Sequence, residues 1–530
     1  MRDLYQKVSC SLGDILNTEY PDFEISLPLW EISSKEEFGD FSTMVALKVA
    51  SKIKEDPLEV AAKIKEKLKK KLPEIDNIGI LKPGFINLFF PKEHLISSFN
   101  KLLREREEYF ASKKEKNVLI EFVSANPTGP LSIAHGRQAV VGDVIANILE
   151  FSGNKVTREY YVNDEGRQID LLVESVGERV KEIEGKNFSL PPDGYLGEYV
   201  KIIAQEVIKQ KPKDLKSFVI PFILSWIDRD LRDLGVKFDT WESQKELIDN
   251  GKVEEAVDFL KKKRLTEEKE GALWFLSTRF GDDKDRVLIK KDENYTYFSS
   301  DVAYHKYKME RKFNKLINLW GPDHHGYIKR VKAAVKALGF KEEVLEIIIV
   351  QLVAIKTKQR MSRRKGTAIP LYDLVKEVGA DAARFYYLMR KNSSHLEFDI
   401  DKAKEISFEN PLYYVQYAHA RICSVFKKAG VNNIQLTHTK FLKDEKEFLL
   451  LRKILQLSCC LDKAYNTLEP VFLIEYLKNV AACFHKFYEE RRILDEEANV
   501  RLARLNLLEA TRIVLACGLN ILGIKPMEKM

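Results

Sequence analysis

Hydrophobic and polar positions follow different periods along the chain and predict three kinds of region. Within the first 112 residues, helical spacing at residues 44–68 precedes a strand-like alternation at residues 78–90. Between residues 117 and 353, short apolar runs typical of buried strands alternate with helical stretches, which indicates a mostly parallel sheet. Beyond residue 399 the strand signals end and long amphipathic helical patterns follow.

Changes in composition set the expected boundaries. The highly charged segment REREEYFASKKEK (residues 104–116) separates a small α+β domain, residues 1–112, from an α/β domain, residues 113–405. The α/β domain is expected to be a Rossmann-like parallel-sheet domain, with a helical insertion at about residues 170–275. Residues 406–530 are expected to form an all-α helical bundle.

Composition excludes several classes of protein. The chain has 530 residues, of which 45% are hydrophobic, and it has no run of about 18 apolar residues that would span a membrane. No secretory or organellar targeting pattern is evident at the N-terminus, so we expect a cytoplasmic protein. Its six cysteines form no C-x-x-C pair, and residues 11–422 contain none, so we expect neither zinc nor a disulfide framework.

Charge indicates where a nucleic acid would bind. The net charge is +7, and lysine and arginine exceed aspartate and glutamate in residues 411–530, whereas residues 1–115 are nearly balanced. If nucleic acid is a partner, the C-terminal region is therefore the better electrostatic platform.

The first chemical motif follows the first predicted strand of the α/β domain. No P-loop is present, and no G-x-G-x-x-G follows a strand. Instead, EFVSANPTGPLSIAHGRQAVVGD (residues 121–143) has prolines and glycines that predict a tight loop before a helix beginning near His135. The free N–H groups and the dipole of such a helix end suit a polyphosphate, and His135 could donate to its oxygens. A histidine at a helix start can also be a simple cap or core residue.

A second motif is strongly basic. In QRMSRRKG (residues 359–366), Arg360, Arg363, Arg364 and Lys365 surround Met361 and Ser362. Such cations can neutralise pyrophosphate as it leaves, although a basic cluster is more often simply solvated surface.

These two motifs resemble the signature sequences of class I aminoacyl-tRNA synthetases, in the forms NPTGPLHxxHGR and KMSxRKG of the arginyl-tRNA synthetase family. The similarity extends over essentially the whole chain. Ser132 replaces the first signature histidine, and Arg360 replaces the first lysine of the second motif. Ser132 can donate one hydrogen bond but carries no charge. The resemblance implies activation of L-arginine with ATP and transfer of the arginyl group to the 3′ end of tRNA(Arg).

The resemblance also implies roles for individual residues in the reaction with ATP. The catalytic residues would be Ser132, His135, Arg360, Ser362, Arg363 and Arg364. The ATP-binding residues would be Asn126, Thr128, Gly129, Pro130, His135, Gly136, Asp323, His325 and Met361. The segment WGPDHHGYIKR (residues 320–330) also invites a metal-site interpretation, but adjacent histidines on a strand point to opposite sides. We therefore expect no metal ligands, and Mg²⁺ only as carried by ATP.

Recognition of arginine should involve carboxylates, because a guanidinium is planar and permanently charged. The family positions carry over to Glu121, Asn126, Tyr297 and Asp301. Tyr297 and Asp301 are four residues apart and would share one face of a helical turn. Taken singly, Glu121 and Asp301 could equally be ordinary strand-end or helix-capping carboxylates.

Three further segments resemble tRNA contacts of the family. NPLYYVQYAHARICS (residues 410–424) resembles the first helix of an anticodon-binding domain, and implies contacts from Tyr417 and Ala418. Met530 occupies a position where the family touches the anticodon loop. In KPGFINLFF, Phe85 and Asn87 resemble residues that contact the tRNA elbow. Core packing for the tyrosines and an ordinary edge strand for KPGFINLFF are the alternatives.

The resemblance therefore predicts tRNA(Arg), L-arginine and ATP as partners, and we expect a monomer. Two rival functions remain at this stage. Another class I synthetase is one, although a cysteinyl enzyme would need thiolate zinc ligands near the sheet. A non-catalytic tRNA-binding paralogue is the other, and Ser132 is the observation that favours it.

Overall fold

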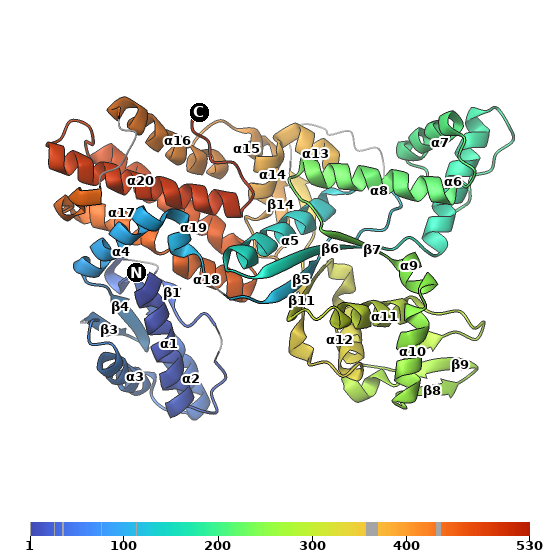
Figure 1. Cartoon of the computed structure of the whole chain (residues 1–530), viewed down its shortest axis with the longest axis horizontal. Coiled ribbons are helices and arrows are strands. Elements are labelled where there is room, and N and C mark those ends of the chain that lie inside the picture. Colours follow the sequence, from blue (N-terminus) through green and yellow to red (C-terminus); the bar gives the residue numbers. More distant parts are fainter. Residues whose placement is uncertain are drawn as a thin grey trace. The chain divides into compact units, whose positions relative to one another are not determined.

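The computed structural model describes residues 2–25, 27–33, 36–75, 77–112, 114–356, 369–430 and 436–530. The chain divides into two compact units (Figure 1). Unit 1 combines residues 1–112 with residues 405–530, and unit 2 consists of residues 113–404. Along the described part of the chain, no helix has the length and apolar character needed to cross a bilayer.

The N-terminal part of unit 1 is an antiparallel sheet with helices. Its strands are β1 (Glu31–Ile32), β2 (Phe41–Thr43), β3 (Asn77–Leu81) and β4 (Phe85–Phe89), in the order β1-β2-β4-β3. Its helices are α1 (Arg2–Glu19), α2 (Val45–Ile53), α3 (Pro57–Lys71) and α4 (Lys92–Glu105). The helical stretch predicted over residues 44–68 is two helices, because Asp56 caps a new helix by accepting from the Leu58 N–H and Pro57 occupies its first turn.

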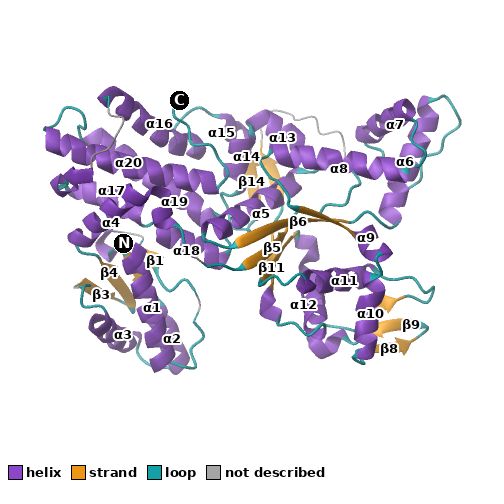
Figure 2. Ribbon diagram, in the orientation of Figure 1, coloured by secondary structure: helices purple, strands orange, loops and turns teal. Residues whose placement is uncertain are grey.

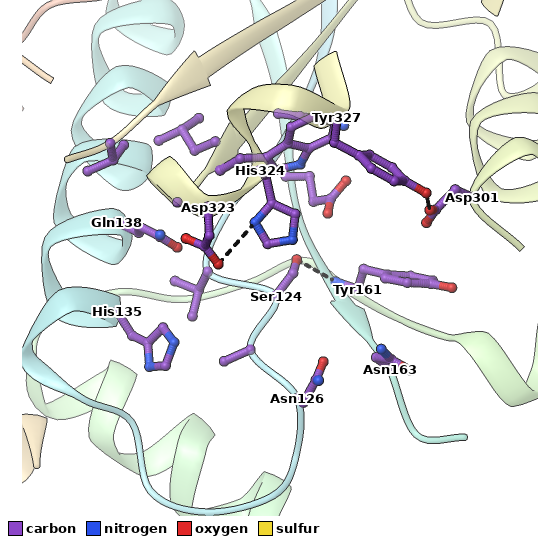
Figure 3. Close-up of a pocket in the computed structure, with 18 of the residues that line it drawn as sticks. Ser124, Asn126, His135, Gln138, Tyr161, Asn163, Asp301, Asp323, His324 and Tyr327 are labelled. Atoms are coloured by element: carbon purple, nitrogen blue, oxygen red, sulfur yellow. Dashed lines mark hydrogen bonds and ion pairs between the residues drawn. The ribbon is translucent and has the colours of Figure 1, made fainter. Parts of the chain in front are cut away.

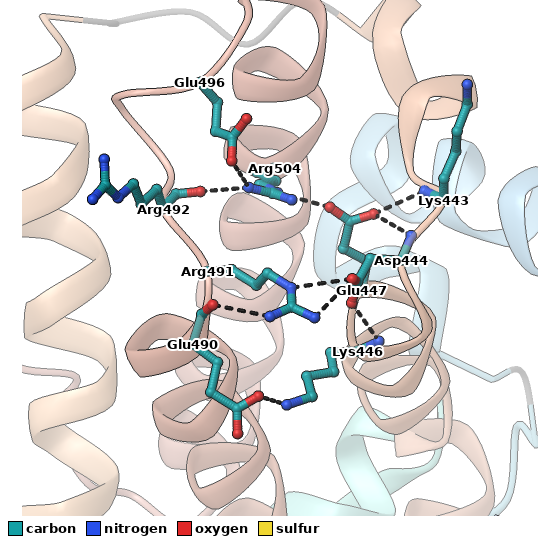
Figure 4. A network of polar contacts seen from close by, with 9 residues as sticks. All are labelled: Lys443, Asp444, Lys446, Glu447, Glu490, Arg491, Arg492, Glu496 and Arg504. Carbon is teal, nitrogen blue, oxygen red and sulfur yellow. Dashed lines mark hydrogen bonds and ion pairs between the residues drawn. The ribbon is translucent and has the colours of Figure 1, made fainter.

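The C-terminal part of unit 1 is all helical. It contains α16 (Pro411–Ala429), α17 (Glu445–Leu455), α18 (Leu457–Thr467), α19 (Val471–Glu490) and α20 (Ala498–Ile521). A buried polar network joins three of these helices (Figure 4). Glu447 accepts from Arg504 Nε at 2.7 Å and from the Lys443 and Asp444 N–H groups, while Arg491 pairs with Asp444 at 2.8 Å. The network fixes the start of α17 against α20 and the end of α19.

The two parts of unit 1 are joined by charged contacts. The buried Asp40 pairs with Arg452 of α17, and its backbone oxygen accepts from Gln456 Nε2 at 3.0 Å. Arg106 pairs with Glu509 of α20 at 3.0 Å. Helix α4 also packs against α17 and α20, so residues 1–112 and 405–530 form one unit.

Unit 2 is built on a five-stranded parallel sheet in the order β12-β11-β5-β6-β7, coloured orange in Figure 2. The strands are β5 (Asn117–Glu121), β6 (Lys155–Val162), β7 (Thr240–Ser243), β11 (Lys315–Trp320) and β12 (Leu345–Ile349). The first strand, β5, lies between β11 and β6, so chain order reverses at the β5–β11 boundary. Ligands bind at the carboxyl ends of strands at such a switch point. The expected parallel-sheet fold is confirmed.

Unit 2 also contains helices and two smaller sheets. The helices are α5 (Ile133–Phe151), α6 (Arg167–Ile183), α7 (Glu198–Gln210), α8 (Lys216–Asp233), α9 (Gln244–Asp249), α10 (Lys252–Lys262), α11 (Tyr297–Glu310), α12 (Ile328–Ala337), α13 (Leu371–Val378), α14 (Ala380–Tyr387) and α15 (Ile400–Lys404). Strands β8 (Thr266–Lys269), β9 (Ala272–Phe275) and β10 (Arg286–Ile289) form an antiparallel sheet, and β13 (Val353–Lys356) pairs with β14 (Leu396–Asp399).

Strand β7 lies within the range 170–275 expected to be a helical insertion. It pairs in parallel with β6, Glu159 opposite Thr240 through Val162 opposite Ser243, and completes the main sheet. Its sequence, TWES, has no apolar run, because an edge strand needs less burial than a central one. The division of the chain into the three domains named above stays a prediction.

Candidate active site

A cavity of about 590 Å³ opens at the carboxyl edge of the parallel sheet in unit 2. Its walls come from the ends of β5, β6, β11 and β12, the first turns of α5, and α11 (Figure 3). The position coincides with the switch point between β5 and β11, where a ligand is expected.

The turn after β5 is strained. Val123 and Ser124 both have left-handed backbones, with φ values of 66° and 39°, although neither is glycine. Contacts from β6 hold this turn, since the Tyr161 N–H donates to Ser124 Oγ at 3.1 Å and Tyr160 Oη donates to the Ala125 oxygen at 2.8 Å. Backbone strain of this kind concentrates at functional sites, where the surrounding structure over-determines it.

At the N-terminus of α5, Ser132 is the N-cap and His135 lies one turn inside the helix. The Ser132 N–H donates to His135 Nδ1 at 3.1 Å, and Ser132 Oγ lies 3.2 Å from the same nitrogen. Burial lowers the pKa of His135, and nearby Asp323 partly opposes the shift. A neutral His135 that accepts at Nδ1 carries its proton on Nε2, where it can donate to a phosphate oxygen. His135 lines the cavity, whereas Ser132 is not a wall residue and contacts His135.

Several predicted ATP residues support the cavity rather than line it. Thr128, Gly129, Pro130 and Gly136 are absent from its walls, which include Asn126. Tyr199 Oη donates to the Thr128 oxygen at 2.8 Å and so holds the turn from outside. A Cβ on Gly136 would lie 2.5 Å from Leu371 Cδ1 and 2.7 Å from Tyr387 Oη, so this glycine lets α5 pack closely on α13 and α14.

The predicted basic loop, with Arg360, Met361, Ser362, Arg363 and Arg364, lies outside the described residues. The described chain just beyond it is tied to the signature turn. The Ile133 N–H donates to the Ile369 oxygen at 3.2 Å, and the Leu371 N–H donates to the Leu131 oxygen at 2.7 Å.

All four predicted arginine-binding residues line the same cavity. Glu121 ends β5, Asn126 lies in the strained turn, and Tyr297 and Asp301 share the first turns of α11. Thr296 caps this helix by accepting from the Ser299 N–H. Sequence therefore identified residues that the fold brings together from two segments far apart in the chain.

Asp301 is the carboxylate with the most perturbed titration in the cavity wall. Loss of contact with bulk water raises its pKa to about 7; the hydrogen bond from Tyr327 opposes this, and the charge of Glu121 adds to it. Tyr327 Oη donates to Asp301 Oδ2 (Figure 3). A cation placed beside Asp301 would favour its ionised form.

The segment after β11 forms a 3₁₀ helix (Pro322–Tyr327), not a strand. Asp323 and His324 line the cavity, and His324 Nδ1 lies 3.5 Å from Asp323 Oδ2 (Figure 3). The family resemblance assigned His325 to the ATP site, but this residue is exposed and is not a wall residue. In the described ranges, no cluster of three His, Cys, Asp or Glu side chains could hold a metal ion.

The predicted elbow-binding residues lie in unit 1. Phe85 and Asn87 on β4 line a second cavity of about 660 Å³, whose walls also include Phe23, Phe38 and Leu81. Asn87 is only 1% exposed, and no described group donates to its Oδ1. A cavity with aromatic side chains and one unsatisfied amide is able to hold a base by stacking and hydrogen bonding.

The predicted anticodon-binding residues lie on α16 and at the C-terminus. The Tyr417 ring stacks on Tyr413 with centroids 5.8 Å apart, and Arg421 donates to Tyr417 Oη at 2.5 Å. Met530 is 50% exposed, whereas Ala418 is fully buried. The side chain of Ala418 therefore does not reach the surface.

Sequence reasoning missed several wall residues: Gln138, Tyr161, Asn163, His324 and Tyr327. Tyr161 Oη and Asn163 Oδ1 are buried atoms without a hydrogen-bond partner among the described residues. Such atoms are often found where a ligand supplies the missing hydrogen bond. Tyr161 lies near the end of β6 and Asn163 directly follows this strand, but no sequence signal separates Tyr161 from the neighbouring Tyr160.

Comparison with known families gives three matches that together span most of the chain. Residues 2–90 match the arginyl tRNA synthetase N terminal domain, and residues 98–193 and 206–407 match the catalytic domain of tRNA synthetases class I (R). Residues 415–530 match the DALR anticodon binding domain.

Individual proteins agree with these matches. An arginine–tRNA ligase of Carboxydothermus hydrogenoformans is 40% identical over 96% of this chain and 94% of its own length. An arginyl-tRNA synthetase structure from Campylobacter jejuni is 37% identical, with a TM-score of 0.78 over 83% of this chain and 100% of its own. The Thermus thermophilus arginyl-tRNA synthetase, at 20% identity, matches in fold over 100% of both chains with a TM-score of 0.79.

Proposed function

This chain belongs to the arginyl-tRNA synthetase family, and from that premise we propose how its residues make it an arginine–tRNA ligase. The observation that carries the proposal is one cavity with a helix N-terminus and His135 on one side and two carboxylates, Glu121 and Asp301, on another. Such a cavity suits a polyphosphate and a guanidinium together.

In the first reaction, an oxygen of the arginine carboxylate attacks the α-phosphorus of ATP. The bond from that phosphorus to the bridging oxygen breaks, and pyrophosphate leaves with the electron pair. In the second, a hydroxyl of the terminal adenosine of tRNA(Arg) attacks the arginyl carbonyl carbon, and AMP leaves. No enzyme nucleophile is required, so the protein contributes positioning and charge stabilisation.

On the arginine side, Glu121 and Asp301 would accept hydrogen bonds from the guanidinium, and Asn126 and Tyr297 would hold the rest of the amino acid. An ion-paired pocket of this kind rejects neutral side chains strongly, because their binding leaves buried charges unpaired. Tyr161 and Asn163 offer further polar atoms in the same wall.

On the ATP side, His135 Nε2 and the N–H groups at the start of α5 would meet the phosphates, and Asp323 and His324 would lie nearer the nucleoside. Thr128, Gly129, Pro130 and Gly136 would shape the turn. We assign neutralisation of pyrophosphate to Arg360, Ser362, Arg363 and Arg364, with Met361 against the nucleotide. Mg²⁺ would arrive on the phosphates of ATP and supply additional charge neutralisation there.

For tRNA, we propose that Phe85 and Asn87 bind an unstacked base of the elbow, and that Tyr417 and Met530 contact the anticodon loop. The N-terminal domain, residues 1–112, and the helical domain, residues 406–530, would thus bind two parts of one tRNA. The enzyme would act as a monomer in the cytoplasm.

Aminoacylation of tRNA(Arg) with labelled arginine and ATP tests the function directly. Charging with arginine but not with lysine or citrulline would support the proposal. Tight binding of tRNA without charging and without ATP–pyrophosphate exchange would instead indicate the non-catalytic paralogue that Ser132 had suggested.

A further inference from the structure

A buried lysine lies behind the carboxylates assigned to the guanidinium. The Lys308 side chain on α11 is fully shielded from solvent, and lysine is almost never buried unless it is paired. Its ammonium group donates to Glu121 Oε2 and, at 3.2 Å, to Asn318 Oδ1. The same nitrogen lies 4.1 Å from the centroid of the Tyr304 ring.

From Lys308, a chain of hydrogen bonds continues to the second carboxylate residue. Asn318 Nδ2 donates to His305 Nε2 at 3.1 Å, and His305 Nδ1 lies 2.8 Å from the Asp301 backbone oxygen. Burial and the charge of Lys308 lower the pKa of His305 to about 3, so this ring is neutral, with one donor and one acceptor nitrogen. Glu121 and Asp301 are thus joined through three buried side chains.

The contact with Lys308 involves only one carboxylate oxygen. Glu121 Oε2 accepts from the ammonium group, whereas Oε1 accepts from none of the described residues. Because a carboxylate held at one oxygen has little freedom to rotate, the orientation of the other oxygen is set before substrate arrives. Glu121 is also a wall residue of the cavity, so the oriented carboxylate borders the substrate space.

We propose that Lys308 is a positioning and specificity-determining residue for arginine. It orients Glu121 and reduces the charge of the two-carboxylate pocket to the single negative charge that one guanidinium neutralises. Lys308 is not a catalytic residue, because it acts on substrate only through Glu121 and Asp301. The inference rests on the proposed arginine site.

The charge balance makes a distinctive prediction about pH. Asp301 faces Glu121 from β5, Lys308 from its own helix, Tyr327 and Arg330 from the segment after β11, and Tyr161 from β6. Loss of the Lys308 charge removes one of the influences that keep Asp301 ionised, and leaves only Tyr327 and Arg330 to oppose the repulsion of Glu121. Arginine binding should then need a higher pH, an effect that a purely structural salt bridge would not produce.

The test compares Lys308→Met with Lys306→Met in steady-state aminoacylation of tRNA(Arg). Lys306 lies on the same helix but pairs with Glu310, away from the cavity, so its replacement is a matched control for losing one lysine. We expect Lys308→Met to raise the KM for arginine about tenfold or more at pH 7, with the KM for ATP unchanged within about twofold. The pH midpoint of kcat/KM for arginine should move upward by about one unit.

Three outcomes would overturn the proposal: an unchanged KM for arginine, equal rises in both KM values, or an unchanged pH midpoint. If circular dichroism shows that Lys308→Met does not fold, Asn318→Asp decides instead, since it keeps the shape and places a competing carboxylate beside the ammonium. The KM for arginine, the KM for ATP and the pH midpoint of this variant are then judged against the same three outcomes. Failure of the wild-type enzyme to charge tRNA with arginine would refute the proposed function and the arginine site on which this inference rests, whereas the three outcomes above refute the role of Lys308 alone.

Discussion

Asp301 should make arginine recognition depend on pH near neutrality. The arginine guanidinium stays charged throughout, so only the protein side titrates. With a pKa of about 7, Asp301 is about 9% ionised at pH 6 and about 91% ionised at pH 8. If only the ionised form binds arginine, the KM for arginine falls about tenfold between these pH values. The direction of the pH effect follows from the raised pKa of Asp301. As pH falls below 7 the carboxylate becomes protonated and the affinity for arginine is lost.

Aminoacylation at saturating ATP and tRNA, with arginine varied at each half unit from pH 6 to 8.5, measures this effect. Asp301→Asn should remove the pH dependence and raise the KM about 30- to 700-fold, which corresponds to the loss of about 2–4 kcal/mol for one desolvated charge pair. The KM for ATP, measured in parallel, controls for general effects of pH. A KM for arginine that stays constant from pH 6 to 8 in the wild type would refute the reasoning.

Three other predictions concern packing, the signature motif and tRNA. Gly136→Ala should lower the unfolding temperature, because the new Cβ would lie 2.5 Å from Leu371 Cδ1 and overpacking costs about 1–3 kcal/mol; Gly177→Ala, whose Cβ would have only an ordinary 3.6 Å contact, should not lower it. Ser132→His should raise kcat by up to about fivefold if the serine merely weakens phosphate contact, as a charge-assisted bond exceeds a neutral one by about 1 kcal/mol; an unchanged kcat would show that this position does not bear on the chemistry. Phe85→Ala should raise the KM for tRNA about 5- to 150-fold through loss of about 1–3 kcal/mol of base stacking, whereas Phe89→Ala, outside that cavity, should leave it unchanged.

Site residues that belong to a sequence motif could be predicted, because the neighbouring residues alone show where they lie relative to a strand end or a helix start. Glu121 closes an apolar strand and His135 follows a turn signature, so each could be placed without knowing the rest of the fold. The same holds for Tyr297 and Asp301, whose spacing puts them on one helix face.

Residues whose role depends on a neighbouring strand could not be placed in the same way. In β6, Tyr160 and Tyr161 are adjacent aromatics, and only the sheet decides which meets the cavity. Tyr160 stacks on Trp241 of β7, while Tyr161 stacks on Tyr304 of α11 and borders the cavity. Strand β7 has no apolar pattern, so the sequence did not predict that Trp241 would lie against Tyr160.

The pair His324 and His325 shows a different limit. Strand geometry would turn adjacent side chains to opposite sides, but Pro322 starts a 3₁₀ helix directly after β11. Within this helix His324 lines the cavity and contacts Asp323, whereas His325 does not line the cavity. Which of two neighbouring histidines meets a ligand thus depends on a local backbone change that the apolar pattern does not signal.

Lys308 connects these points, because its function follows from the way the fold closes around α11. Sequence alone would place a lysine near the end of a helix on the surface, where it would favour the helix dipole. In the structure, β5 and β11 contribute Glu121 and Asn318 to the same ammonium group. The two strands on either side of the switch point therefore share one buried cation, which reduces the negative charge of the pocket that opens at their ends. A substrate site at this edge is consequently defined as much by the charge buried behind its carboxylates as by the carboxylates themselves.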